Sequence, residues 1–302
     1  MVNDAGAPAV AVVGAGVMGN AIATRLLETG CAVAVYDLDR EKVNALVAKG
    51  ARAAISAADA AHAATFVITS LNSAKIIERA IFGENGIAGG ANASTLLIDM
   101  SSIDPDATRV LAARLGDLCG ARWIDCPLSG GAPGALAGRL TVMAGGSAEE
   151  FERARPVMSR LTANYSLMGP LGAGQATKLV NQVLCAIGFQ AVAEAVALAE
   201  RAGVAADRIP AALAGGRADS RILQEFGAKM ARRDYSPTGR LDNMLKDLDG
   251  VQALAQATGT PMPVTDLVAA IHRRFVSAGQ GADDNAALMR QFDEPGAKPA
   301  ER

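Results

Sequence analysis

Residues 9–37 read AVAVVGAGVMGNAIATRLLETGCAVAVYD, and this stretch decides the fold of the first half of the chain. An apolar run at 9–13 ends at a glycine turn, and a helical pattern continues from there to Gly30. A second apolar run, 31–37, follows and ends at Asp37. The pattern predicts a strand, a glycine-rich turn, a helix stopped by glycine, and a second strand.

The glycine turn has the spacing G-x-G-x-x-G, supplied by Gly14, Gly16 and Gly19. In a dinucleotide site the first glycine makes a tight turn, the second lets the backbone approach the pyrophosphate, and the third allows close helix–strand packing. The free N–H groups of the helix N-terminus then bind phosphate. Because the motif follows a predicted strand and opens a helix, we predict a dinucleotide site rather than a structural turn. The turn comprises Gly14, Ala15, Gly16, Val17, Met18 and Gly19.

Asp37 ends the second predicted strand, at the spacing expected of a ribose-binding carboxylate. A carboxylate at this position accepts hydrogen bonds from ribose hydroxyls and repels a 2′-phosphate, so it favours NAD over NADP. Arg40, three residues on, keeps NADP open as the alternative. The structural alternative for Asp37 is an exposed loop carboxylate.

The remaining pattern changes character near residue 168. Apolar runs typical of strands occur at 64–71, 94–101, 121–128 and 138–146. Helical patterns follow at 175–201, 206–214, 219–232, 241–258, 263–277 and 284–291. Strands alternating with helices predict a parallel sheet covered on both faces. We therefore expect an α/β domain with a doubly wound Rossmann-type sheet over residues 1–168 and an all-α domain over 169–302.

Composition argues against several classes of protein. The 302 residues include 29 basic and 31 acidic ones, and this balance argues against a nucleic-acid-binding protein. The four cysteines are scattered without a C-x-x-C pair, so we predict reduced thiols, no metal site and a cytoplasmic location. The apolar segment 179–199 is interrupted by polar residues, which predicts a buried helix rather than a membrane span.

Acid–base chemistry is expected from a lysine, because the chain has only two histidines, and both His62 and His272 lie in predicted helices. Lys178 occupies the first turns of a largely apolar helix, where partial desolvation makes a neutral amine accessible. Asn181 and Gln182 share its helix face. On the residues alone, a solvated lysine near a helix start is an equal alternative.

For two glycine-rich stretches, the residues alone allow more than one interpretation. Gly172 and Gly174 precede Lys178, and we expect a flexible lead into its helix rather than a phosphate loop, because no strand–turn–helix unit surrounds them. Residues 129–131 read SGG, and a hydroxyl beside free backbone N–H groups makes a cradle for a carboxylate. A loop-rich hairpin is an equal interpretation of that stretch.

Five motifs together resemble the β-hydroxyacid dehydrogenase family over roughly residues 8–292. They are GAGVMG, DMSS, DCPLSGGAPGALAGRLTVMAGG, GAGQATKLVNQ and LKDLDGVQALAQATGTPMP. That family includes 3-hydroxyisobutyrate dehydrogenase and tartronate semialdehyde reductase and is related to 6-phosphogluconate dehydrogenase. The resemblance implies NAD-dependent hydride transfer between the nicotinamide and C3 of a small 3-hydroxy acid or its semialdehyde. It also implies that Lys178 is the catalytic acid–base.

The resemblance also implies roles for other residues. Cofactor contacts beyond the glycine turn would come from Asp37, Leu71, Asn72, Ser101 and Lys246, and for Lys246 a solvated charge is the alternative. Substrate contacts would come from Ser129, Gly130, Gly131, Asn181 and Gln182. Arg217 and Ser220 are further candidates, although a helix cap also explains Ser220.

The chain departs from the family at several positions. Asn72 stands where proline is usual, Gln182 replaces a second asparagine as in tartronate semialdehyde reductases, and Gly239–Arg240 lacks the usual aromatic residue. Arginines at 217, 221 and 240 suggest, as one alternative, a larger, phosphorylated or sulfonated substrate. The other alternative is a non-catalytic NAD-binding scaffold. The expected partners are a small carboxylate substrate and, across the long helix at 175–201, a second subunit in a homodimer or homotetramer; neither nucleic acid nor membrane is expected.

Overall fold

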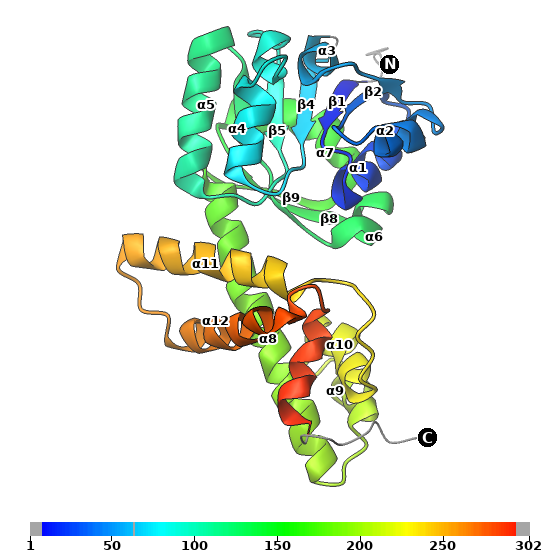
Figure 1. Cartoon of the computed structure of the whole chain (residues 1–302), viewed down its shortest axis with the longest axis vertical. Coiled ribbons are helices and arrows are strands. Elements are labelled where there is room, and N and C mark those ends of the chain that lie inside the picture. The colour runs from blue at the N-terminus through cyan, green and yellow to red at the C-terminus, as the bar shows by residue number, and fades with distance from the viewer. Residues whose placement is uncertain (1–7, 63, 294–302) are drawn as a thin grey trace. The chain divides into compact units, whose positions relative to one another are not determined.

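The computed structural model describes residues 8–62 and 64–293. The chain forms two compact units, Met1–Lys178 and Leu179–Arg302, and helix α8 (Ala173–Arg201) runs through the division between them (Figure 1). The domain boundary expected between residues 168 and 169 stays a prediction.

The first unit is built on one nine-stranded sheet with the order β3-β2-β1-β4-β5-β6-β8-β7, in which β9 pairs with β8. Strands β1 to β6 are parallel, whereas β8 is antiparallel to both β6 and β7. The strands are β1 (Ala9–Val13), β2 (Ala32–Tyr36), β3 (Arg52–Ala53), β4 (Phe66–Thr69), β5 (Leu96–Asp99), β6 (Arg122–Asp125), β7 (Leu128–Ser129), β8 (Leu140–Gly145) and β9 (Thr162–Gly169).

Helices cover both faces of this sheet, as the sequence predicted (Figure 1). Alternate residues of β1 point to opposite cores: Val10 and Val12 join a cluster with α1, α2, α6 and α7, while Ala11 and Val13 join one with α3, α4 and α5. The helices are α1 (Val17–Glu28), α2 (Arg40–Val47), α3 (Ala57–His62), α4 (Ala74–Phe82), α5 (Pro105–Cys119), α6 (Gly131–Leu136) and α7 (Ala148–Leu161). The structure confirms a doubly wound, Rossmann-type sheet.

The second unit is helical over its described residues, which confirms the expected change of character. Its helices after α8 are α9 (Ile209–Leu213), α10 (Arg221–Ala231), α11 (Leu241–Thr258) and α12 (Pro263–Phe275). The segment Asn285–Phe292, expected as a helix, forms 3₁₀ turns. A separate apolar core gathers side chains of α8, α10, α11, α12 and this last segment.

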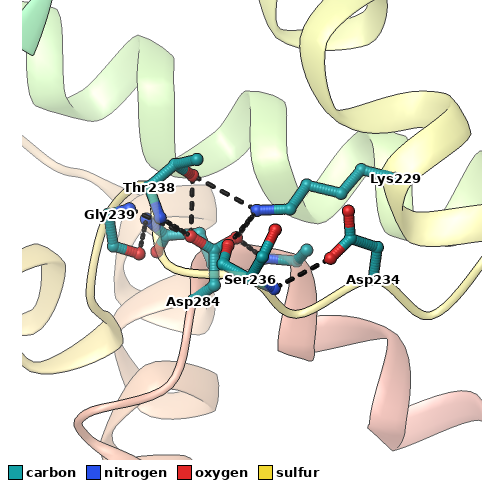
Figure 2. Close-up of polar contacts among 8 residues, drawn as sticks. Lys229, Asp234, Ser236, Thr238, Gly239 and Asp284 are labelled. Carbon is teal, nitrogen blue, oxygen red and sulfur yellow. Dashed lines mark hydrogen bonds and ion pairs between the residues drawn. The ribbon is translucent and has the colours of Figure 1, made fainter.

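A buried ion pair organises the loop that precedes α11 (Figure 2). Asp284 accepts hydrogen bonds from the N–H and hydroxyl groups of Thr238 (2.6 and 2.7 Å) and from the N–H of Gly239 (3.0 Å). Its other carboxylate oxygen lies 3.0 Å from Lys229 Nζ. Burial by itself raises the pKa of Asp284, but these bonds and one from the Ala286 N–H outweigh it and hold the pKa below its usual value.

Helix α8 is long and apolar enough to cross a membrane by length and composition, with a window of mean hydropathy 1.7. Half of that window is buried inside the protein, and a single helix of this kind is weak evidence for a membrane span. Its exposed apolar side chains include Val180, Leu184 and Leu198.

Candidate active site

The glycine turn after β1 has the geometry of a dinucleotide site. Gly14 has φ +99°, and a Cβ there would lie 2.6 Å from the carbonyl oxygen of Ser70. A Cβ on Gly19 would lie 1.8 Å from the Gly14 carbonyl oxygen, so only glycine lets α1 pack this close to the turn. By contrast, a Cβ on Gly16, the N-cap of α1, would meet nothing within 4 Å, and no side chain caps this helix. Open space in front of uncapped N–H groups fits a bound pyrophosphate.

The other residues of the turn differ in exposure. Ala15 is buried, Met18 is half-buried against the core, and Val17 is exposed.

Asp37 ties the end of β2 to this turn. Its Oδ2 accepts the N–H of Ala15 at 2.6 Å, and its Oδ1 accepts the N–H of Asp39 at 2.8 Å. The carboxylate is therefore held at the glycine turn and is not a loose loop residue, and each oxygen keeps a lone pair for a ribose hydroxyl. Arg40, the residue that kept NADP open as the alternative, donates to the carbonyl oxygen of Ala54 (3.3 Å).

The loops after β4 and β5 meet through two of the expected cofactor residues. The N–H of Leu71 donates to Ser101 Oγ at 3.0 Å, and Ser101 is buried. Asn72 follows as an exposed residue, and Ser73 caps α4. These loops lie at the carboxyl ends of parallel strands, where open α/β sheets bind their ligands.

Two buried carboxylates that the sequence reasoning missed lie side by side at this edge, Asp99 ending β5 and Asp125 ending β6. Asp99 accepts the hydroxyl of Thr69 (2.9 Å), and burial raises its pKa. Burial raises the pKa of Asp125 to about 6, against the lowering effect of hydrogen bonds from the N–H groups of Gly172 and Gln175. Asp99 and Asp125 are each the last residue of a strand. Acidic residues at the ends of two predicted strands were the sequence signal that could have identified them.

The expectation of a flexible lead into the lysine helix is wrong. Gly172 has φ +88°, and its N–H donates to Asp125 Oδ1 at 2.7 Å. A Cβ on Gly174 would lie 2.4 Å from the Met143 carbonyl oxygen and 2.6 Å from Asp125 Oδ2. Gly172 is required by its positive φ, and Gly174 is required because the helix packs directly on β6 and β8.

Lys178 lies half-buried on α8, one turn before Asn181 and Gln182. Asn181 Nδ2 donates to Gln182 Oε1 (2.8 Å), and Gln182 Nε2 donates to Asp247 Oδ2 of α11 (2.5 Å). Lys246 Nζ lies 3.3 Å from the other oxygen of Asp247. Asp247, another residue that sequence reasoning missed, therefore brings together Gln182 and Lys246 in the second unit.

The stretch Ser129–Gly131 joins β7 to α6 and contains a backbone that needs glycine. Gly130 has φ +118° and Gly131 φ +59°, and both are exposed. Ser129 pairs with Thr141 of β8, so the stretch begins the connection of an antiparallel pair, and this connection contains α6. A hairpin and a carboxylate cradle at these exposed glycines are therefore compatible interpretations of the stretch.

The remaining candidate residues either have structural hydrogen-bond partners or are exposed to solvent. Ser220 caps α10 by accepting the N–H of Leu223 at 3.0 Å, which confirms the capping alternative, and Arg217 is exposed. His62 ends α3. His272 is buried in α12, where burial lowers its pKa and Nδ1 contacts the Val268 carbonyl oxygen at 2.9 Å. Both histidines are helix residues, as predicted.

Comparisons with known proteins place the chain in a class. The family model for the NAD binding domain of 6-phosphogluconate dehydrogenase matches residues 9–169. The model described as NAD-binding of NADP-dependent 3-hydroxyisobutyrate dehydrogenase matches residues 172–292. The chain is an NAD(P)-dependent oxidoreductase that acts on CH–OH donors. It belongs to the β-hydroxyacid dehydrogenase family.

Similar proteins act on several hydroxy acids and aldehydes. The NAD-dependent L-serine dehydrogenase of Pseudomonas aeruginosa is 34% identical, with 94% of this chain and 97% of that protein covered. The 3-sulfolactaldehyde reductase of Escherichia coli is 33% identical, with 94% and 95% covered. The structure of 3-hydroxyisobutyrate dehydrogenase of Mycobacterium tuberculosis with L-serine has a TM-score of 0.86 at 28% identity, with 95% and 99% covered.

Proposed function

We propose that this enzyme transfers hydride between NAD and C3 of a small 3-hydroxy acid or its semialdehyde, of the 3-hydroxyisobutyrate or tartronate semialdehyde/glycerate type. The observation that carries the proposal is the packing of the start of the Lys178 helix on the end of β6, at the same carboxyl edge of the parallel strands as the dinucleotide turn after β1. Bound NAD supplies the hydride acceptor. The chain must then supply a base for the hydroxyl proton and donors for the carboxylate.

Lys178 is the acid–base in this proposal. In the oxidation direction its neutral amine takes the hydroxyl proton, and in the reduction direction its ammonium returns a proton to the nascent alkoxide. The half-buried position of Lys178 near the start of α8 supports this role. The N–H groups of the exposed residues Gly130 and Gly131, with the Ser129 hydroxyl, bind the substrate carboxylate. Asn181 and Gln182 orient the substrate.

NAD is the proposed cofactor, with NADP as the alternative. Asp37 is held at the glycine turn with its negative charge facing the site expected for ribose, which disfavours a 2′-phosphate. Arg40 is bonded to the Ala54 carbonyl. Within the same proposal, Leu71, Asn72, Ser101 and Lys246 line the cofactor, and the protein is a cytoplasmic homodimer or homotetramer.

A larger or sulfonated aldehyde acid is the second candidate, favoured by the sulfolactaldehyde reductase relative. Two of the three arginines that suggested an anionic substrate group have acidic partners: Arg221 with Glu225 at 2.6 Å, and Arg240 with Asp242. These pairs reduce the positive charge available to a second anionic group, so we rank this candidate second.

The test is NAD(H)-coupled turnover across glycerate, 3-hydroxyisobutyrate, threonate, 3-hydroxypropionate and serine, with 3-sulfolactaldehyde as a separate arm. We expect turnover on at least one of the small hydroxy acids. Turnover confined to the sulfonated aldehyde supports the second candidate instead. Tight NAD binding without turnover in either arm contradicts both and leaves the scaffold interpretation.

A further inference from the structure

The first turn of α8 is held by two buried side chains whose role the proposed function does not use. Asp125, at the end of β6, accepts the N–H groups of both Gly172 (2.7 Å) and Gln175 (2.8 Å). Glycines surround its carboxylate closely: a Cβ on Gly145 would lie 2.5 Å from Oδ1, and one on Gly174 2.6 Å from Oδ2. The Asp125 carboxylate therefore fills the space between these glycines. As a result, the start of α8 can pack against it in only one position.

Gln175 connects the same turn to the loop after β5. Its amide nitrogen donates to the Ser101 carbonyl oxygen at 3.0 Å, and its amide oxygen accepts the N–H of Ile103 at 3.2 Å. Ser101 in turn accepts the N–H of Leu71 through its hydroxyl. Because Gln175 is only 1% exposed, an apolar replacement leaves a buried carbonyl and a buried N–H without these partners.

Lys178 lies three residues after Gln175, one turn further along the helix. We propose that Asp125 and Gln175 are positioning residues that hold Lys178 at a set distance from the cofactor loops, an inference that rests on the acid–base role proposed for Lys178. The loops after β4 and β5, the end of β6 and the lysine helix then form one hydrogen-bonded assembly. Small displacements of a reacting group have large effects on rate, so this assembly affects turnover more than binding.

The energetics of Asp125 support a functional role. Its donors are N–H groups at a helix N-terminus, whose dipole favours a negative charge. Burial still raises the pKa of Asp125 to about 6, and the neighbouring Asp99 carboxylate adds to the rise. Other titratable or charged groups in this region are the Cys126 thiol, whose pKa burial raises, and Arg109, which donates to the Leu171 carbonyl oxygen. A carboxylate kept in such an environment is typical of functional sites.

The experiment compares Asp125→Asn with a matched control, Glu150→Gln. Glu150 is also a buried carboxylate in the first unit, accepts a helix-terminal N–H from Ser147 (2.7 Å), and pairs with Arg122 at the opposite end of β6. Gln175→Met is the second variant and keeps the test decisive if Asp125→Asn does not fold. Four quantities are measured: kcat, KM for NAD, Tm, and the rate of reductive methylation of Lys178, which is followed by mass spectrometry.

We expect Asp125→Asn and Gln175→Met to lower kcat by about tenfold or more, with KM for NAD changed less than about threefold. The methylation rate of Lys178 should change by about threefold or more in both, while Glu150→Gln lowers Tm and leaves both readouts within about twofold. If all three variants lower Tm and leave kcat and Lys178 methylation unchanged, both residues are merely structural and the inference is wrong.

The methylation readout separates this inference from the proposed function. Altered Lys178 methylation with unchanged kcat supports positioning but refutes the acid–base role. If the wild-type enzyme turns over none of the substrates offered, the proposed function fails, and the methylation comparison still decides whether Asp125 and Gln175 position Lys178.

Discussion

At the residue scale, we expect Asp37 to determine which dinucleotide the enzyme prefers. Its carboxylate accepts the N–H of Ala15 through Oδ2 and that of Asp39 through Oδ1, so replacement by asparagine removes the charge and keeps an acceptor for one of these two bonds. We expect Asp37→Asn to raise the ratio of kcat/KM for NADP to that for NAD by about tenfold or more, because the repulsion of a 2′-phosphate is lost. Steady-state kinetics with both cofactors measures the ratio.

The control for this prediction is Asp39→Asn, two residues on. Asp39 caps α2 by accepting the N–H of Glu41 at 3.0 Å, and asparagine is an equally good cap. An unchanged ratio in Asp37→Asn, or an equal change in both variants, would show that Asp37 does not select the cofactor.

Two helical glycines of the first unit should respond oppositely to the same substitution. A Cβ on Gly174 would collide with the Met143 carbonyl and the Asp125 carboxylate, so Gly174→Ala should destabilise by about 1–3 kcal/mol. On Gly116 in α5 a Cβ would meet only the Ala121 carbonyl at 3.8 Å, and Gly116→Ala should stabilise by about 0.4–1 kcal/mol. Denaturant unfolding of both variants gives the free energies, and equal signs would contradict the packing described.

Sequence patterns located the motifs but not the carboxylates that organise them. Gly14 and Gly16 stand out by spacing, since they belong to a local strand–turn–helix pattern, whereas Lys178 stands out by its place near the start of an apolar helix and by the family resemblance. Asp125 gains its importance from Gly172 and Gln175, 47 and 50 residues away, and such long-range partners leave no periodic signal. The same holds for Asp284 and Lys229, which are 55 residues apart.

At the element scale, the parallel strands were predictable because strands buried on both faces read as continuous apolar runs. β1 and β4 are examples. β9 (TANYSLMG) was missed because much of it is exposed and it has no such run, and β3 and β7 because each has two residues. Helices were predictable over the second unit, but the 3₁₀ geometry of Asn285–Phe292 was not.

The loop before α11 depends on the Lys229–Asp284 pair, whose side chains are 10% and 0% exposed. Lys229→Met leaves a buried carboxylate without its cation, and we expect a loss of about 3–5 kcal/mol in the free energy of unfolding. Chemical denaturation at neutral pH measures this loss. A change below about 1 kcal/mol would show that the pair behaves as an exposed surface pair.

Asp284 also makes the stability of the protein depend on pH, and the sign of this dependence follows from its lowered pKa. Asp284 contributes stability above the pKa it has in the unfolded chain, and this contribution is lost as the pH falls through the lower folded-state value. Asp284→Asn should therefore flatten the acid side of the stability profile. A profile parallel to that of the wild type would contradict this assignment.

At the scale of the whole molecule, α8 carries apolar side chains that are exposed to solvent in a single chain. Leu184 is 69% exposed and Leu198 72% exposed. We expect a dimer or larger oligomer in sedimentation analysis, and Leu184→Lys should shift it towards monomer because the charge must be desolvated at the interface. Leu118→Lys on α5, at a site 63% exposed, is the matched control and should leave the oligomer intact. A wild-type monomer would contradict the expectation.

The most direct measurement of the central claim is the turnover of Lys178 variants on the best hydroxy acid, with NADH binding measured in parallel. Lys178→Met removes the amine, and Lys178→Arg keeps the charge but cannot give up its proton. The acid–base assignment predicts a loss of about 10²–10⁴ in kcat for both variants, with NADH affinity retained. Activity within about tenfold of the wild type in Lys178→Met, or activity restored by arginine, would contradict it.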